Sequence, residues 1–101
     1  MSGPPDAQLV RAAARGDEAA WGELVDRHAG LVWSVARGCG LATHYAAEVS
    51  QATWRHLASQ LGRIHDPSHV GEWLAVRAAD ESRLRLTRGG PGRRARTSPA
   101  F

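Results

Sequence analysis

Between residues 42 and 61 the chain repeats apolar side chains at steps of three and four, the spacing of one helix face. The apolar stripe consists of Val49, Thr53, Trp54, Leu57 and Leu61. Glu48, Gln51 and Arg55 follow the same spacing on another face, so they form one exposed polar row. A helix that meets a partner has this pattern, and so does a helix whose polar face is only solvated.

Two helices are predicted before this stretch. Asp6 is expected to cap a short helix over residues 7–15, which Gly16 ends by adopting a left-handed conformation. Asp17 caps the next helix, over residues 18–38, with the inward positions Trp21, Leu24, Val25, Leu31, Val32 and Val35. His28 lies on the same stripe, where a structural histidine bonded to a backbone carbonyl is favoured over a ligand or catalyst.

After a glycine-flanked turn over residues 38–40, Thr43 is the expected cap of the central helix. A loop is predicted over residues 62–69 because it contains glycine and proline. Ser68 is then expected to cap a last helix over residues 69–87, whose inward residues are Val70, Trp73, Leu74 and Ala78.

These elements predict an all-α fold, a small bundle of three main helices plus a short N-terminal helix. No stretch alternates with the period of two that a strand requires. The expected organisation is a disordered lead over residues 1–5, one helical domain over residues 6–88, and a disordered, flexible basic C-terminal tail over residues 89–101.

Charge is distributed unevenly along the chain. All 13 basic residues are arginine; residues 1–82 hold seven of them against ten acidic residues, a net charge of −3. Residues 83–101 hold the other six and no acidic residue, a net charge of +6. Arginine binds phosphate bidentately, so the basic end is a candidate for contacting a nucleic-acid backbone, although basic tails are also commonly only solvated.

Several kinds of chemistry are disfavoured. The single Cys39 excludes an internal disulfide and a cysteine-based metal cluster. His65 and His69 are four residues apart, but they share a proline-containing loop, so neither a metal site nor a cofactor is expected. The chain contains no phosphate loop, serine elbow or dinucleotide fingerprint, so it is not expected to be an enzyme. Without a leader or an apolar run long enough to cross a bilayer, a cytoplasmic protein is expected.

Three segments, in this order and spacing, resemble the second conserved region of bacterial RNA polymerase sigma factors, most closely the extracytoplasmic-function type. The first is LVRAAARGDEAAWGELVDRHAGLVWSVA, in which a Gly-Asp turn precedes a helix. The second is AAEVSQATWRHL, and the third, after a loop with Asp-Pro, is EWLAVRAADESRLRL. The resemblance covers roughly residues 6–88.

The resemblance implies two binding surfaces. In the family the third helix docks on the clamp helices of the polymerase beta-prime subunit, and the matching positions here are Glu48, Gln51 and Arg55, supported by Val49 and Trp54. The following loop and last helix recognise the minus-ten promoter element as single-stranded DNA and capture a flipped base. The matching positions are Arg63, His65, Asp66, Ser68, Trp73, Arg77, Asp80, Arg83 and Arg85. Core polymerase and promoter DNA are therefore the expected partners, with an anti-sigma factor as a further one.

Two features depart from the family pattern. Tyr45 and Glu48 stand where the organising helix usually carries two aspartates, and the domain that reads the minus-thirty-five element is absent, as in a fragment or a stand-alone relative.

Two alternatives stay open: a sigma-like interaction protein without promoter recognition, and a small helix-turn-helix protein that reads a major groove. The adjacent Asp80 and Glu81 count against the second alternative, and Trp73 is also a candidate core residue because it lies on the apolar stripe.

Overall fold

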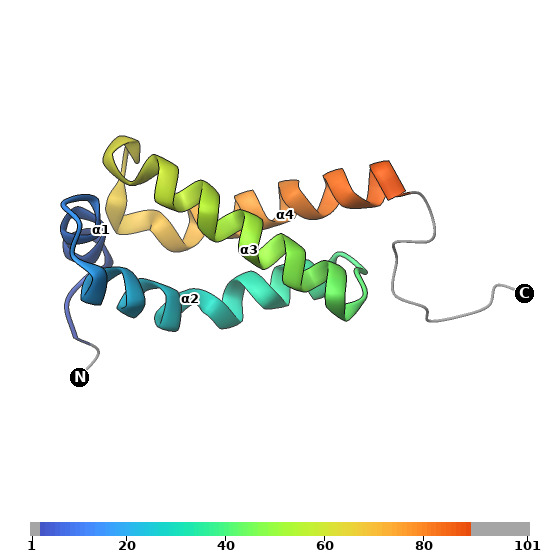
Figure 1. The fold of residues 1–101 in the computed structure, drawn as a ribbon, viewed down its shortest axis with the longest axis horizontal. Helices are drawn as coiled ribbons and strands as arrows, with labels where there is room; N and C mark the ends of the chain where they lie inside the picture. Colours follow the sequence, from blue (N-terminus) through green and yellow to red (C-terminus); the bar gives the residue numbers. More distant parts are fainter. Residues whose placement is uncertain (1–2, 90–101) are drawn as a thin grey trace, which may run out of the picture.

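The computed structural model describes residues 3–89, with side chains described as far as residue 87. It contains the helices α1 (Asp6–Ala14), α2 (Glu18–Gly38), α3 (Thr43–Gln60) and α4 (Val70–Gly89) (Figure 1). No strand occurs between residues 3 and 89, so the prediction of an all-α fold with three long helices and one short helix is confirmed there. Within the same residues, none of the helices combines the length and the hydrophobicity that crossing a bilayer requires.

The three long helices pack against one another around a single core. α2 and α4 run in the same direction, and α3 runs back across them (Figure 1). The short α1 lies at the end where α2 begins, and it also contacts the connection between α3 and α4. That connection is made of two 3₁₀ turns, η1 (Leu61–Arg63) and η2 (Pro67–His69).

Each of the helices α1 to α4 contributes fully or nearly fully buried aliphatic side chains to the core: Leu9, Val10, Leu24, Val32, Val49, Leu57, Val70, Leu74 and Ala78. The predicted inward position Leu31 is wrong, since its side chain is 39% exposed. The buried stripe of α2 passes through Val32 and Ala36, and Leu31 is rotated from Val32 by about 100° around the helix axis. Leu31 therefore lies at the flank of the buried stripe.

The turn between α1 and α2 follows the sequence prediction. Gly16 has a φ of 95°, a left-handed conformation that glycine adopts without strain. Asp17 caps α2, because its Oδ1 accepts a hydrogen bond of 3.1 Å from the backbone N–H of Ala20.

Asp6 has a different role from the predicted cap. The cap position of α1 is Pro5, and the Asp6 carboxylate lies within the first turn, 3.0 Å from Nη1 of Arg27 and 3.0 Å from Nε2 of His28. The predicted backbone-carbonyl partner of His28 is therefore replaced by this carboxylate. Arg27 also donates to the carbonyl of Pro4 over 2.7 Å, so one carboxylate and one guanidinium tie the start of α1 to the middle of α2.

The predicted caps of the last two helices are wrong as well. Ala42 occupies the cap position of α3, and the hydroxyl of Thr43 instead accepts a hydrogen bond from Nη1 of Arg37 over 3.1 Å. At the second 3₁₀ turn, Asp66 is the cap, since its Oδ1 accepts from the backbone N–H of Ser68 at 3.3 Å. Proline after Asp66 forms the first position of that turn, where a missing N–H costs nothing.

Candidate functional site

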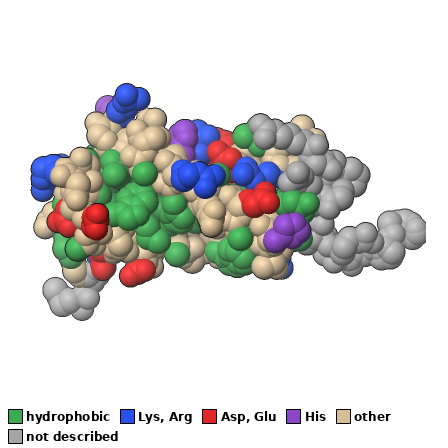
Figure 2. Space-filling model, viewed as in Figure 1, with side chains coloured by type: hydrophobic (Ala, Val, Ile, Leu, Met, Phe, Trp, Pro, Cys, Tyr) green, Lys and Arg blue, Asp and Glu red, His purple; other side chains and the backbone are tan. Residues whose placement is uncertain are grey.

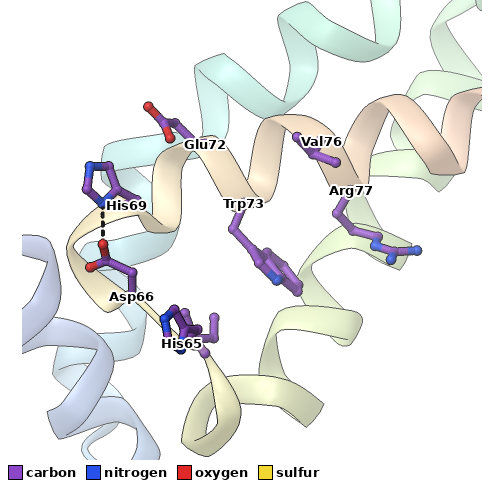
Figure 3. A pocket seen from close by; sticks show the side chains of 8 residues that line it. His65, Asp66, His69, Glu72, Trp73, Val76 and Arg77 are labelled. Carbon is purple, nitrogen blue, oxygen red and sulfur yellow. Dashed lines mark hydrogen bonds and ion pairs between the residues drawn. The ribbon is translucent and has the colours of Figure 1, made fainter.

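A pocket of about 350 Å³ opens where the connection between α3 and α4 meets the first turns of α4 (Figure 3). This volume lies at the lower end of the range for small-ligand sites, which is about 300–1,000 Å³. Trp73 and Arg77, four residues apart, extend from the same side of α4 (Figure 3). The complete lining is Ile64, His65, Asp66, His69, Glu72, Trp73, Val76 and Arg77.

Trp73 forms both an edge of the core and a wall of the pocket. Its ring packs against the buried core and stacks on the imidazole of His56 from α3, with centroids 5.5 Å apart and planes inclined by 25°. The core assignment and the binding assignment made from the sequence are therefore compatible for this residue. Because stacking on His56 of α3 holds the Trp73 ring in place, the ring offers a rigid aromatic face to a molecule that enters the pocket.

A hydrogen-bonded group at the start of α4 forms one rim of the pocket. The Asp66 carboxylate accepts from the hydroxyl of Ser68 over 2.7 Å and lies 2.7 Å from Nδ1 of His69. The hydrogen bond from Ser68, followed by that from His69, lowers the pKa of Asp66 below its usual value of 3.8. The same bond to Asp66, with its negative charge, raises the pKa of His69 above 6.5. Nδ1 thus donates to the ionised carboxylate, and Nε2 is the ring atom available to a ligand.

Glu81 pairs with two of the arginines that were predicted to bind DNA. Its carboxylate is largely buried and lies 2.9 Å from Nη1 of Arg85 and 3.9 Å from Nη1 of Arg77, each one helical turn away. Nε of Arg85, which is buried, lies 3.6 Å from Oε1 of Glu48 on α3. A residue predicted to contact polymerase and a residue predicted to contact DNA are therefore joined in one ion-pair group.

The remaining predicted DNA-binding arginine with a described side chain on α4 is also paired. Arg83 contacts the carboxylate of Asp80 one turn earlier on the same exposed surface of the helix. Asp80 and Arg83 border a second, separate cavity near the end of α4 rather than the pocket at its start. Asp80 therefore neutralises a neighbouring cation, and the face that carries both residues has no net charge.

The polar row predicted on α3 is exposed along its whole length: Glu48, Gln51 and Arg55 all reach the surface. Val49 is fully buried, so a direct contact between this residue and a partner is excluded, and it can only support the row from beneath. Trp54 is partly buried and makes an edge-to-face contact with Trp21 of α2, with centroids 6.0 Å apart. Figure 2 shows charged side chains of both signs along the surface of α3, beside an apolar area between α2 and α3.

The structure thus brings together four of the nine predicted DNA-binding residues in one pocket: His65, Asp66, Trp73 and Arg77. Ser68 supports the rim through Asp66, whereas the exposed Arg63 does not line the pocket. Ile64 lies within the loop over residues 63–68 that the resemblance matches to promoter recognition, so the sequence prediction missed three lining residues, which are His69, Glu72 and Val76. Spacing gives a signal for two of them, because His69 is four residues from His65 and Val76 is three from Trp73.

Among residues 3–89, no group of three or more histidine, cysteine, aspartate or glutamate side chains is arranged to hold a metal ion. Comparison of the chain with protein-family models, with curated proteins and with solved structures found no match.

Proposed function

We propose that this chain is a sigma-factor-like module that binds core RNA polymerase through α3 and holds an unpaired base of the minus-ten promoter strand in the pocket beside α4. The proposal begins from the resemblance of three sequence segments to the second conserved region of sigma factors. It implies action in the cytoplasm, where core polymerase and the promoter are found.

One observation carries the proposal. His65, Asp66, Trp73 and Arg77, assigned to promoter recognition from sequence alone, come from two different elements and line the same pocket. A base removed from its stack needs an aromatic or apolar surface and hydrogen-bonding groups for its edge. Trp73, Val76 and Ile64 supply the first requirement, and the side chains of Asp66 and Arg77 supply acceptors and donors for the second.

The α3 surface suits a helical protein partner. Glu48 and Arg55 present opposite charges about two turns apart, with Gln51 between them, so the row can pair with complementary charges in one orientation only. The neighbouring apolar area adds burial to these polar contacts (Figure 2). We propose this combined surface as the contact for the coiled-coil clamp of the polymerase.

A second candidate function is favoured by the ion pairs on α4. Arg77, Arg83 and Arg85 each contact a carboxylate, so the helix has less positive charge to offer a DNA strand than its sequence suggests. A sigma-like adaptor that occupies polymerase or another regulator without reading a promoter would need only the α3 surface.

Capture of core polymerase by the full chain, followed by binding of melted promoter strands to the captured complex, tests the proposal and separates the two candidates. Polymerase capture with a preference among strand sequences is expected. Capture without any preference would favour an adaptor bound to polymerase. Failure to capture polymerase would refute the sigma-factor proposal and leave only an adaptor for another regulator.

Two variants with matched controls assign the surfaces. Gln51→Ala with Arg55→Glu should abolish polymerase capture, whereas Gln8→Ala in α1 with Arg15→Glu just after it makes the same changes at exposed positions and should not. Val76→Glu places a negative charge at a pocket side chain that is 62% exposed, and should remove the strand preference while sparing polymerase capture. Leu31→Glu on α2 is its control, since Leu31 is 39% exposed and outside the pocket.

A further inference from the structure

The arginines of α4 differ in whether their N–H donors are already used; the basic tail predicted over residues 89–101 lies beyond the described side chains. Arg83 and Arg85 each donate a hydrogen bond to a carboxylate of their own helix. Nη1 of Arg77 lies 3.9 Å from Oε2 of Glu81, which is too far for a hydrogen bond. Among the described residues Arg77 thus makes no hydrogen bond, and its guanidinium keeps its N–H donors for a molecule in the pocket.

Glu81 compensates the charge of Arg77 without occupying its donors. The Glu81 side chain is 16% exposed and is held by Arg85, so it stays close to the Arg77 guanidinium. A phosphate that approached Arg77 would also approach this carboxylate and would be repelled by it. The edge of a nucleobase has no net charge, so it can use the same donors without that repulsion. Arg77 is therefore better suited to the acceptors of a base than to the phosphates of the strand.

Trp73 lies between Arg77 and Asp66 in the pocket (Figure 3). His56 stacks on one face of its indole ring and does not belong to the pocket lining, so a base would stack on the side of the ring that is turned away from His56. The pocket thus has hydrogen-bond donors on one side of an aromatic surface and a carboxylate on the other.

The Asp66 carboxylate can accept one further hydrogen bond from a ligand. It already accepts from the backbone N–H and the hydroxyl of Ser68, and it is paired with Nδ1 of His69. A carboxylate has about four lone-pair sites, so one of them remains, and the side chain is 52% exposed. Because the hydrogen bonds from Ser68 and His69 lower the pKa of Asp66, the group is ionised at neutral pH and acts only as an acceptor.

We propose that the base held in the pocket is guanine, whose O6 and N7 accept hydrogen bonds from Arg77 while its 2-amino group donates to Asp66. This inference rests on the proposed function and names the base that the strand presents. Arginine pairs bidentately with the adjacent O6 and N7 acceptors of guanine, which is the commonest base-specific contact in protein–DNA complexes. The 2-amino group lies on the opposite side of the purine, so guanine can reach from Arg77 across the Trp73 ring to Asp66.

The other three bases match this arrangement less well. Adenine carries an amino donor beside N7, where the guanidinium requires an acceptor. Thymine has an N–H group between its two carbonyls, so it offers no adjacent pair of acceptors. Cytosine has the adjacent acceptors N3 and O2, but its amino group lies next to N3, and the opposite side of its ring would turn only C–H groups towards Asp66. Guanine alone combines two adjacent acceptors with a donor on the far side.

Changing one base in an otherwise uniform strand tests the assignment. Binding of the full chain, alone and with core polymerase, is measured by fluorescence anisotropy on labelled single strands of about twelve thymidines. One central base is guanine, adenine, cytosine or thymine. The guanine strand should bind roughly 5- to 140-fold more tightly than the others, the range expected for a bidentate pair. Two analogues should each lower the affinity: 7-deazaguanine, which lacks the N7 acceptor, and hypoxanthine, which lacks the 2-amino group.

Arg77→Gln identifies the side chain that reads the base. Glutamine pairs bidentately with adenine, so this variant should change the preference from guanine to adenine and bind guanine and 7-deazaguanine equally. Arg11→Gln is the matched control, because it makes the same change of charge at an exposed position of α1 outside the pocket. The control should retain the preference for guanine.

Equal affinity of the unmodified chain for guanine and 7-deazaguanine would overturn the assignment, as would an Arg77→Gln variant that still prefers guanine. An unchanged affinity for hypoxanthine would overturn the contact with Asp66. A preference for another base would overturn the choice of guanine and leave the pocket as a base-binding site, so the proposed function would survive. Equal binding of all four strands, or binding of none, would overturn both guanine and promoter reading, and polymerase capture tests the α3 surface separately.

Discussion

Gly71→Ala tests the packing of the first turn of α4 against α2. Gly71 lies in the first turn of α4, and a Cβ atom built there would be 3.3 Å from Cε1 and 3.6 Å from Nδ1 of His28. The imidazole cannot easily withdraw, because its Nε2 lies 3.0 Å from the Asp6 carboxylate. Gly22 and Gly30 are matched controls inside α2, since a Cβ atom at either position would meet nothing within 4 Å.

Substitution by alanine should change the stability of the protein in different directions at the open position Gly30 and at the crowded position Gly71. Alanine is favoured over glycine in a helix interior by about 0.8–1 kcal/mol, so Gly30→Ala should stabilise the protein by about that amount. For a domain of this size that corresponds to a rise in Tm of roughly 4–8 °C. At Gly71 the gain is opposed by crowding against His28, and inserting a methyl group into a packed contact costs about 1–3 kcal/mol. Gly71→Ala should therefore lower Tm or leave it unchanged.

Thermal and urea unfolding followed by circular dichroism measure both effects on the full chain. Repeating Gly71→Ala in a His28→Ala background removes the crowding, so the substitution should no longer destabilise the protein there. If Gly71→Ala raises Tm as much as Gly30→Ala does, the first turn of α4 does not approach His28, and the packing of α4 against α2 at this contact is wrong.

Two further predictions concern the pocket. Trp73→Ala should destabilise the protein by about 3–5 kcal/mol. A double-mutant cycle with His56→Ala should give a coupling of about 0.5–1.5 kcal/mol, and a coupling near zero would show that the two rings do not stack. Because the pKa of Asp66 is lowered, its interaction with His69 is fully present above pH 3.8. Because the pKa of His69 is raised, the same interaction is fully present below pH 6.5. The pair should therefore be fully formed between these two pH values. By nuclear magnetic resonance, His69 should titrate above 6.5 and return towards 6.5 in Asp66→Asn, and an unchanged midpoint in that variant would contradict the pairing.

The helices were predictable because their signals are local. The apolar period, the helix end signalled by Gly16 and the cap signalled by Asp17 place the second helix at residues 18–38, which are the bounds of α2. Helix caps were less predictable, although the same residue types were used. Asp17 and Asp6 both stand near the start of a helix, yet only Asp17 caps one, since Asp6 is drawn to Arg27 and His28 more than twenty residues away. A local sequence pattern carries no information about distant partners that compete with the helix end for a carboxylate.

The pocket was partly predictable for the same reason. His65, Asp66, Trp73 and Arg77 were assigned together through the resemblance, but their convergence depends on how two 3₁₀ turns fold the connection against α4. The spacing of Val76, three residues from Trp73, was only a weak signal for a pocket residue, because an exposed apolar side chain off the main stripe is common on helix surfaces. Val76 lines the pocket only because the connection between α3 and α4 forms the other side of it.

Glu48 illustrates why the two proposed surfaces cannot be separated by sequence alone. Arg77, Glu81 and Arg85 follow one another at steps of four, so their pairing within α4 was readable from the spacing. The approach of Glu48 to Arg85 was not, because 37 positions separate them. A substitution at Glu48 would therefore change the polymerase-facing row and also the environment of a buried arginine on α4. Gln51 and Arg55 belong to the same row and have no described ion pair with α4, so a loss of polymerase capture in their variant reports on α3 alone.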